Sequence, residues 1–477
     1  MIDIEGHLWF KGLAKGAGGA GPPNQALGVY MSGRTALGAQ SVAERWKRFF
    51  PLWAQAALRM RPRWTPALVL LAVCAFDVPA QEALLISLAG EQSAEARRKS
   101  ASALEASDMK LGPTLWKLEA GLGLEANDNI QLVPQPREGD LIFRPQAGAE
   151  MLLPVSDKNT LILAMAGGYS AYVEHPQFNR WFIRPGSELS FDLYAGDFWW
   201  NVHDRLSLLE DAYQDPTVVG VANYALLQNV AGISVVWDLN KLKLKLGYDH
   251  VNYDVLSGAD QVAGQTPDGD SEVFSSSLGY TLRPGLFGGL EMGGSFINYS
   301  DSNPGQFFTE ATQWNVGAFA QAEVTDYTAV RASVGYDQFL PEPTGGAASV
   351  ENFEGLYFQA SLANRFNRFL QIGLDAGQNL NFSLYGGVIN LTYARLGLDW
   401  TFLRKIHFTT SFTFEHGTQI GVEQEHFDRY GPGMSLGREL AQNLSATLRY
   451  QYYDRVSDLA GRDYTVNIAT VDLQYRF

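Results

Sequence analysis

The sequence predicts an all-β protein: a transmembrane, antiparallel, up-and-down β-barrel of about 18 strands, with both termini on the periplasmic side. Three observations lead to this prediction. The chain ends in an alternating strand that stops on an aromatic residue, Phe477. The same alternation of apolar and polar residues continues upstream over most of the chain. Short and long connections alternate between these runs, as in barrels with tight periplasmic turns and longer outer loops.

The C-terminal strand reads YTVNIATVDLQYRF. One face is apolar and consists of Ala469, Val471, Leu473 and Tyr475; the other consists of Thr470, Asp472, Gln474 and Arg476. A strand that ends the chain on an aromatic residue is typical of bacterial outer-membrane barrels, where the last strand closes the sheet and is read by the insertion machinery. We therefore expect Tyr475 and Phe477 to form an assembly signal.

Composition agrees with a sheet-rich membrane protein. The 477 residues include 48 glycines and 12% aromatic residues but only 18% charged residues. The net charge of −15 disfavours nucleic acid as a partner. The mean hydropathy of −0.12 excludes a helical membrane protein. It is compatible with a barrel, because apolar outward residues there alternate with polar inward residues and the mean stays low.

The N-terminal part of the chain does not alternate. An apolar run at 65–76 follows Arg59, Arg61 and Arg63 and precedes Val78-Pro79-Ala80, which predicts a secretory signal peptide over 60–80. The run is too short to span a bilayer. Residues 1–59 are then an extension or the product of a misplaced start, and residues 81–113 a periplasmic lead-in or small plug. The barrel is expected to comprise residues 114–477, which contain no cysteine.

The barrel region divides into alternating runs. In the run that begins at Leu242, for example, Leu242, Leu244 and Leu246 alternate with Lys243 and Lys245. The apolar register of the clearest runs carries no charge, as expected if it faces lipid, where a charge at mid-bilayer costs about 2–4 kcal/mol. The predicted strands are 114–128, 140–155, 160–172, 179–194, 197–210, 222–238, 242–255, 272–283, 286–299, 311–325, 328–340, 354–366, 369–382, 388–403, 406–418, 426–441, 444–456 and 464–477.

Two prolines fall inside predicted strands. Pro145 and Pro185 cannot donate a ladder hydrogen bond, so we expect a bulge or a late strand start at each. The connections themselves are short at 156–159, 240–241, 284–285, 326–327, 367–368, 404–405 and 442–443. They are longer near 129–139, 211–221, 256–271, 302–309, 343–353, 419–425 and 458–463. None is long, which favours a simple or wide channel over one narrowed by a long loop folded inward.

The polar register holds charges of both signs and supplies the pore-lining candidates. These are Lys243, Lys245, Arg331, Arg395, Arg449, Asp337, Asp375 and Asp399. Facing acids and bases would create a transverse field that filters solutes by charge and shape. The alternative is that these residues pair with each other on neighbouring strands and only keep the interior wet.

No catalytic or metal-binding pattern stands out. The histidines are scattered, and His203 and Asp204 are adjacent in a strand, so their side chains point to opposite faces. The acidic segment around Asp268, Asp270 and Glu272 lacks the ligand spacing of an EF-hand and is interpreted as a solvated loop. The sequence thus predicts no enzyme activity, no metal site and no cofactor.

Residues 114–477 as a whole resemble the outer-membrane β-barrel porins associated with exopolysaccharide secretion. The resemblance rests on the signal peptide, the number of strands, the terminal VDLQYRF and the segment GLGLEANDNI at 121–130. It implies a passive exit channel for a secreted polysaccharide in the bacterial outer membrane. The implied partners are outer-membrane lipid, the barrel assembly machinery and periplasmic polysaccharide export proteins. The alternatives are a general or solute-specific diffusion porin and a structural barrel with a filled lumen.

Overall fold

The computed structural model describes residues 109–209, 211–220, 225–257, 268–299, 308–343, 352–382, 388–403, 405–420 and 424–477. The predictions for 1–59 and 60–80, and for 81–108 of the lead-in segment, lie outside these residues. Within the described part of the chain, no helix is long and apolar enough to cross a membrane.

One sheet of 19 strands accounts for almost all of the described residues. β1 (Met109–Leu111) is a short addition that pairs only with β2, which leaves 19 − 1 = 18 strands in the wall. These are β2 (Thr114–Asn127), β3 (Asp140–Pro154), β4 (Thr160–Tyr172), β5 (Arg180–Ala195), β6 (Phe198–Leu209), β7 (Ala225–Leu239), β8 (Leu242–Ser257), β9 (Gly269–Arg283), β10 (Leu286–Tyr299), β11 (Phe308–Thr325), β12 (Thr328–Pro343), β13 (Phe353–Asn367), β14 (Leu370–Phe382), β15 (Val388–Phe402), β16 (Ile406–Ile420), β17 (Glu425–Ala441), β18 (Leu444–Ser457) and β19 (Tyr464–Arg476).

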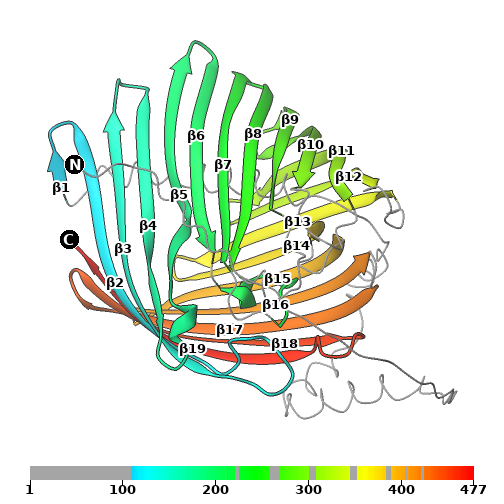
Figure 1. Cartoon of the computed structure of the whole chain (residues 1–477). Helices are drawn as coiled ribbons and strands as arrows, with labels where there is room; N and C mark the ends of the chain where they lie inside the picture. The colour runs from blue at the N-terminus through cyan, green and yellow to red at the C-terminus, as the bar shows by residue number, and fades with distance from the viewer. Residues whose placement is uncertain are drawn as a thin grey trace, which may run out of the picture. The chain divides into compact units, whose positions relative to one another are not determined.

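The wall closes between its first and last strands. β19 pairs antiparallel with β2, with Tyr475 opposite Ala120, and every other pair joins consecutive strands. Figure 1 shows the red β19 alongside the blue β2 at the seam. Closure satisfies the backbone groups that an open edge would leave unpaired. The predicted closed antiparallel barrel of 18 strands is confirmed, and its predicted strands match the observed ones to within a few residues.

The two registers face opposite sides of the wall. In β8 the apolar Leu246 is 45% exposed on the outside, whereas its neighbour Lys245 borders a cavity on the inside. The outward register is rich in exposed Leu, Val, Phe and Tyr throughout the barrel. This arrangement buries the apolar face only when lipid surrounds the barrel.

One of the two prolines disturbs the register as predicted. Between β4 and β5 the register shifts near Pro185, where Gly186 adopts a φ of +94°. The prediction is wrong at Pro145: the β3–β4 ladder leaves out Arg144 and Pro145 but resumes at Gln146 in the same register, and β3 begins at Asp140. Both interruptions follow from the missing proline N–H.

Inward-facing glycines let aromatic rings lie flat on the wall. A Cβ at Gly335 would lie 2.5 Å from Cε1 of Tyr357, and a Cβ at Gly317 would lie 2.2 Å from the Tyr357 hydroxyl. The Tyr357 ring thus covers two glycines of neighbouring strands and donates a hydrogen bond of 2.8 Å to Glu291. This packing keeps a large side chain on the wall instead of projecting it into the lumen.

Candidate functional site

A short loop between β6 and β7 leaves the wall and crosses the lumen. This inward loop, residues 211–220, includes the 3-10 helix η2 (Ala212–Gln214). Its Val218 and Val219 are 0% and 1% exposed and pack in one cluster with Leu132 and with Val466 and Ile468 of β19. In the ring, β2, β3, β4 and β5 lie between β6 and β19, so the contact runs through the interior.

Polar contacts hold the first residues of the inward loop. Near its start, Asp211 accepts a hydrogen bond of 2.7 Å from Arg144 on β3, which also lies 3.4 Å from Glu125 on β2. On the far wall, Nη1 of Arg429 donates a hydrogen bond of 2.8 Å to the Tyr213 carbonyl oxygen. The strands β18, β19, β2, β3, β4 and β5 separate β17 from β6. Asp211 and Tyr213 are two residues apart, so both contacts hold the start of the loop inside the barrel, between β3 and β17.

The far anchor is itself a buried ionic and aromatic group. Nε of Arg429 lies 2.6 Å from Glu415 on β16, and both side chains are 2% exposed. The Arg429 guanidinium stacks 4.7 Å from the Tyr453 ring, and the Tyr453 and Tyr213 rings are 6.1 Å apart. Arginine suits this position because its planar group can bond a carboxylate and a carbonyl while it stacks on a ring.

The two acids of the inward loop titrate differently. Burial opposes ionisation of Asp211, but the charge and hydrogen bond of Arg144 outweigh it and hold the pKa of Asp211 below its ordinary value. Burial raises the pKa of Asp215, and the hydrogen bonds from Thr217 only partly offset this effect. Asp211 of the loop therefore ionises more readily than a free carboxyl group, and Asp215 ionises less readily.

The inward loop corrects one expectation from the sequence. The short connections favoured a channel that no inward-folded loop narrows, but residues 211–220 fold inward and contact β19 and β17. A recognisable pattern was present: Tyr213, Val218 and Val219 are apolar or aromatic residues in a connection that would otherwise be polar. Apolar residues in a connection indicate that it packs against something.

Three of the predicted pore-lining residues lie together. Lys243, Lys245 and Arg331 border a cavity of about 610 Å³ on the inner wall, together with Glu291, Asp238 and Phe319. Lys243 lies 2.9 Å from Asp238, whereas Arg331 has no carboxylate within 4.0 Å among the described residues and instead lies 6.0 Å from the Phe319 ring. We name this pocket the basic cavity.

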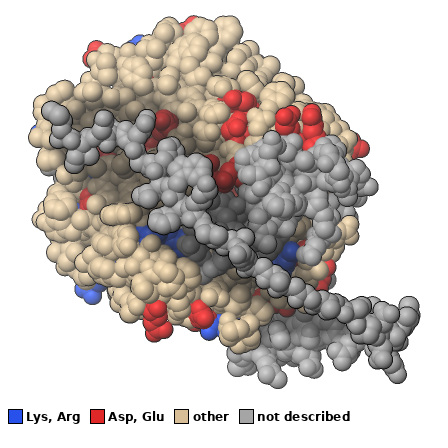
Figure 2. Space-filling view, viewed as in Figure 1, with Lys and Arg blue, Asp and Glu red and all other residues tan. Residues whose placement is uncertain are grey.

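The other predicted pore-lining residues are dispersed. Asp375 and Arg395 face each other across β14 and β15, and Arg395 also lies 3.7 Å from Glu415. Arg449 lies 3.7 Å from Asp472 on β19. Asp399 lies opposite Gln371 and Thr409, and Asp337 is fully buried at the wall between β11 and β13. Pairing with acids on neighbouring strands, which was the alternative interpretation, therefore describes Lys243, Arg395 and Arg449. Figure 2 shows basic and acidic atoms inside the hollow of the barrel.

The predicted assembly signal lies at the seam. The Tyr475 and Phe477 rings are 5.1 Å apart in an edge-to-face arrangement on the outer surface, where Phe477 is 60% exposed. The amide of Phe477 donates a hydrogen bond of 3.0 Å to the Leu118 carbonyl oxygen. The last residue thus takes part in closure of the sheet.

Several solved outer-membrane proteins have a similar but distant structure. OpdL of Pseudomonas aeruginosa is 10% identical, with a TM-score of 0.44 over 77% of this chain and 99% of that chain. OccK2 (OpdF) of the same species, solved with glucuronate, is 11% identical, with a TM-score of 0.43 over 76% and 98%. OccAB2 of Acinetobacter baumannii is 14% identical, with a TM-score of 0.44 over 76% and 98%.

Comparison of sequences gives a family. No curated protein sequence matches the chain. The sequence profile of a family described as "Putative beta-barrel porin 2" matches residues 103–477, which include the whole wall of the barrel. The chain therefore belongs to this β-barrel porin family and is a porin of the bacterial outer membrane.

Proposed function

We propose that the protein is a passive diffusion channel for small hydrophilic solutes, narrowed by the inward loop. The observation that carries this proposal is the pair of anchors, Arg144 to Asp211 and Arg429 to Tyr213, which hold the start of the loop inside the barrel. A barrel of this size encloses an aqueous interior unless something fills it. A loop held inside the wall reduces the free cross-section of this interior.

Charge supports a sorting role for the same lumen. Residues of both signs line the inner register, and a pore wall with fixed charges selects solutes by charge and by size. The guanidinium of Arg331 in the basic cavity has no acidic partner among the described residues. We therefore propose that anionic solutes are favoured on their way past the basic cavity.

Export of a secreted polysaccharide was the function that the resemblance implied. No feature of the residues described here favours a polymer over a small solute, and a polymer requires a continuous route past the inward loop. The diffusion channel is thus the proposal that agrees better with the anchored loop. The experiments below distinguish this diffusion channel from polymer export and from a filled structural barrel.

The test is conductance of the purified protein in a planar bilayer, with and without the inward loop. Deletion of residues 211–220 is tolerable because Leu209 and Leu226 pair directly, so residue 210 and residues 221–224 can connect β6 to β7. We expect the deletion to raise single-channel conductance and to admit larger neutral sugars into liposomes. Asp326→Asn, an exposed change in the tight turn between β11 and β12, is the control and should leave both unchanged.

Three results would contradict the proposal. Absence of current in the wild-type protein would indicate a filled barrel. Equal conductance with and without residues 211–220 would show that the loop does not limit flow. Loss of secreted polymer in a strain that lacks the protein, with unchanged uptake of small solutes, would favour the export channel.

A further inference from the structure

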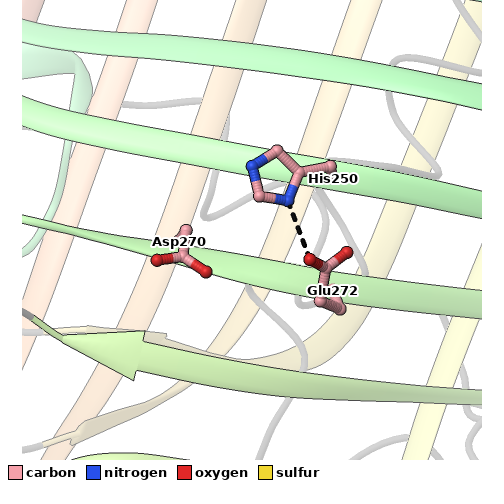
Figure 3. A group of neighbouring side chains, drawn as sticks. All are labelled: His250, Asp270 and Glu272. Carbon is pink, nitrogen blue, oxygen red and sulfur yellow. Dashed lines mark hydrogen bonds and ion pairs between the residues drawn. The ribbon is translucent and has the colours of Figure 1, made fainter.

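A histidine and two carboxylates come together on the outer surface of the barrel, away from the lumen. His250 lies on β8, and Asp270 and Glu272 lie on β9 (Figure 3). One ligand atom from each, an imidazole nitrogen or a carboxylate oxygen, lies within 4.8 Å of the other two. Among the residues that the structure describes, this is the one group of this composition.

The register between β8 and β9 creates the group. His250 pairs directly with Glu272, and Asp270 is the next residue of β9 on the same face. These three residues share the outward register of exposed Phe274 and Leu278, so they do not face the lumen. The chemistry of this group is therefore independent of solute passage.

Neighbouring residues hold the two carboxylates in place. The Tyr248 hydroxyl donates a hydrogen bond of 2.6 Å to Oε2 of Glu272, and the Asn298 amide donates one of 3.2 Å to Oδ2 of Asp270. Nδ1 of His250 lies 3.0 Å from Oε1 of Glu272 (Figure 3). Oriented carboxylates of this kind are typical of metal sites, where outer partners fix the ligands.

The position of the group also favours a cation. Tyr248 and Phe274 are the next outward residues of β8 and β9 beside the group. Their exposed rings lie 5.2 Å apart, and the rings of Phe274 and Phe296 lie 6.3 Å apart, as in the aromatic belt at a membrane interface. Apart from Arg283, which pairs with Leu286 beside the β9–β10 turn, the outward register from β6 to β13 contains no Lys or Arg among its described residues. Its carboxylates, which we name the acidic rim, are Asp204, Asp254, Asp270, Glu272, Glu310, Glu342 and Glu354.

We propose that His250, Asp270 and Glu272 bind a divalent transition-metal ion such as Zn²⁺ at the membrane boundary. An imidazole and two carboxylates match the nitrogen and oxygen ligands of Zn²⁺, and three protein ligands leave a position open to a water or headgroup oxygen. Tetrahedral coordination places ligand atoms about 3.3 Å apart, so small side-chain rotations close the site. The ion takes the place of the proton between His250 and Glu272.

The test is calorimetric titration of the protein in neutral detergent micelles with Zn²⁺ alone. We expect saturable binding by the wild-type protein and a loss of affinity of more than about tenfold in His250→Ala and in Asp270→Asn. The control is His407→Ala, because Nδ1 of His407 lies 3.0 Å from the Thr401 hydroxyl oxygen and His407 belongs to no group of metal ligands among the described residues. This control should bind Zn²⁺ as the wild type does.

Acidification provides a second readout. Binding should weaken on acidification, because protons compete with the metal ion for its ligand atoms. Absence of saturable binding, or equal affinity in the wild type and His250→Ala, would overturn the proposal. His7 and Cys74 lie outside the described residues, so only the binding that His250→Ala removes is assigned to this site.

Discussion

The Arg429 guanidinium on β17 donates a hydrogen bond of 2.8 Å to the backbone carbonyl of Tyr213, a residue 216 positions earlier in the chain. The same guanidinium forms a buried pair with Glu415. One side chain thus links the far wall of the barrel to the inward loop. Its two roles, in stability and in holding the loop, can be separated by mutation.

Arg429→Ala should lower stability by at most about 3–5 kcal/mol, because it leaves the buried Glu415 carboxylate with only the more distant Arg395 at 3.7 Å. The double variant Arg429→Leu/Glu415→Leu removes both charges and should recover most of that stability. Both variants lose the donor to Tyr213, so both should show higher and noisier conductance in planar bilayers. Arg449→Ala, which removes an exposed inward arginine, is the control, and a conductance increase in it would argue against a specific anchor.

Arg331→Ala should reduce any preference of the channel for anions. The Arg331 guanidinium lies in the basic cavity with no carboxylate within 4.0 Å among the described residues, so its charge is not cancelled locally. The measurement is the reversal potential in a salt gradient across a planar bilayer. Arg438→Ala removes an arginine from the outward register and should leave the potential unchanged. Identical shifts in the two variants would exclude a role for the basic cavity.

The pH dependence of conductance should follow the two acids of the inward loop. Asp215, which faces Arg429 and Glu415, has a raised pKa. Its charged form therefore weakens the packing of the inward loop against the barrel wall at neutral pH. This packing becomes stronger as the pH falls through the raised pKa and Asp215 takes up a proton. Asp211, which faces Arg144, has a pKa below its ordinary 3.8, so its contribution is present above that value and is lost only as the pH falls through the lowered pKa.

Conductance should therefore decrease on mild acidification and rise again in strong acid. Asp215→Asn should remove the first change, and Asp211→Asn should raise conductance already at neutral pH. A titration by single-channel recording checks both. A monotonic rise in the wild type would contradict the assignment.

Gly335→Val should destabilise the barrel by about 1–3 kcal/mol, since a side chain there meets the Tyr357 ring and the Val316 carbonyl oxygen. Displacement of Tyr357 also breaks its hydrogen bond to Glu291. Gly397→Val is a matched control, because a Cβ at this inward glycine of β15 meets no atom within 4 Å. Urea unfolding in detergent compares the two, and equal losses would show that the ring packing contributes nothing.

Phe477→Glu should reduce the amount of protein assembled in the outer membrane. The residue lies at the end of the barrel seam, where a charge costs only about 0–1 kcal/mol, so a large loss would reflect failed recognition during assembly and not instability. Fractionation followed by gels with unheated and heated samples measures the folded amount. Arg476→Ala, a change of the neighbouring inward residue, should assemble normally. Normal assembly of Phe477→Glu would contradict the predicted signal.

The sequence was sufficient for the strands because their determinants are local. Alternation with period two marks each run, a proline marks each of two ladder interruptions, and the uncharged apolar register of the clearest runs reflects the cost of a charge in lipid. The same rules placed Lys243, Lys245 and Arg331 on one register. They could not show that these three border a shared cavity, because this depends on how β8 and β12 curve toward each other.

By itself, then, the sequence determined a closed outer-membrane barrel, its strand limits and its inward and outward faces. The tertiary structure decided that residues 211–220 cross the lumen to Arg429 and that His250 lies beside Asp270 and Glu272. The physical reason is the range of the interactions. Side-chain alternation is set by neighbouring residues along one strand, whereas the inward loop and the His250 group depend on register and packing between segments that are distant in the chain.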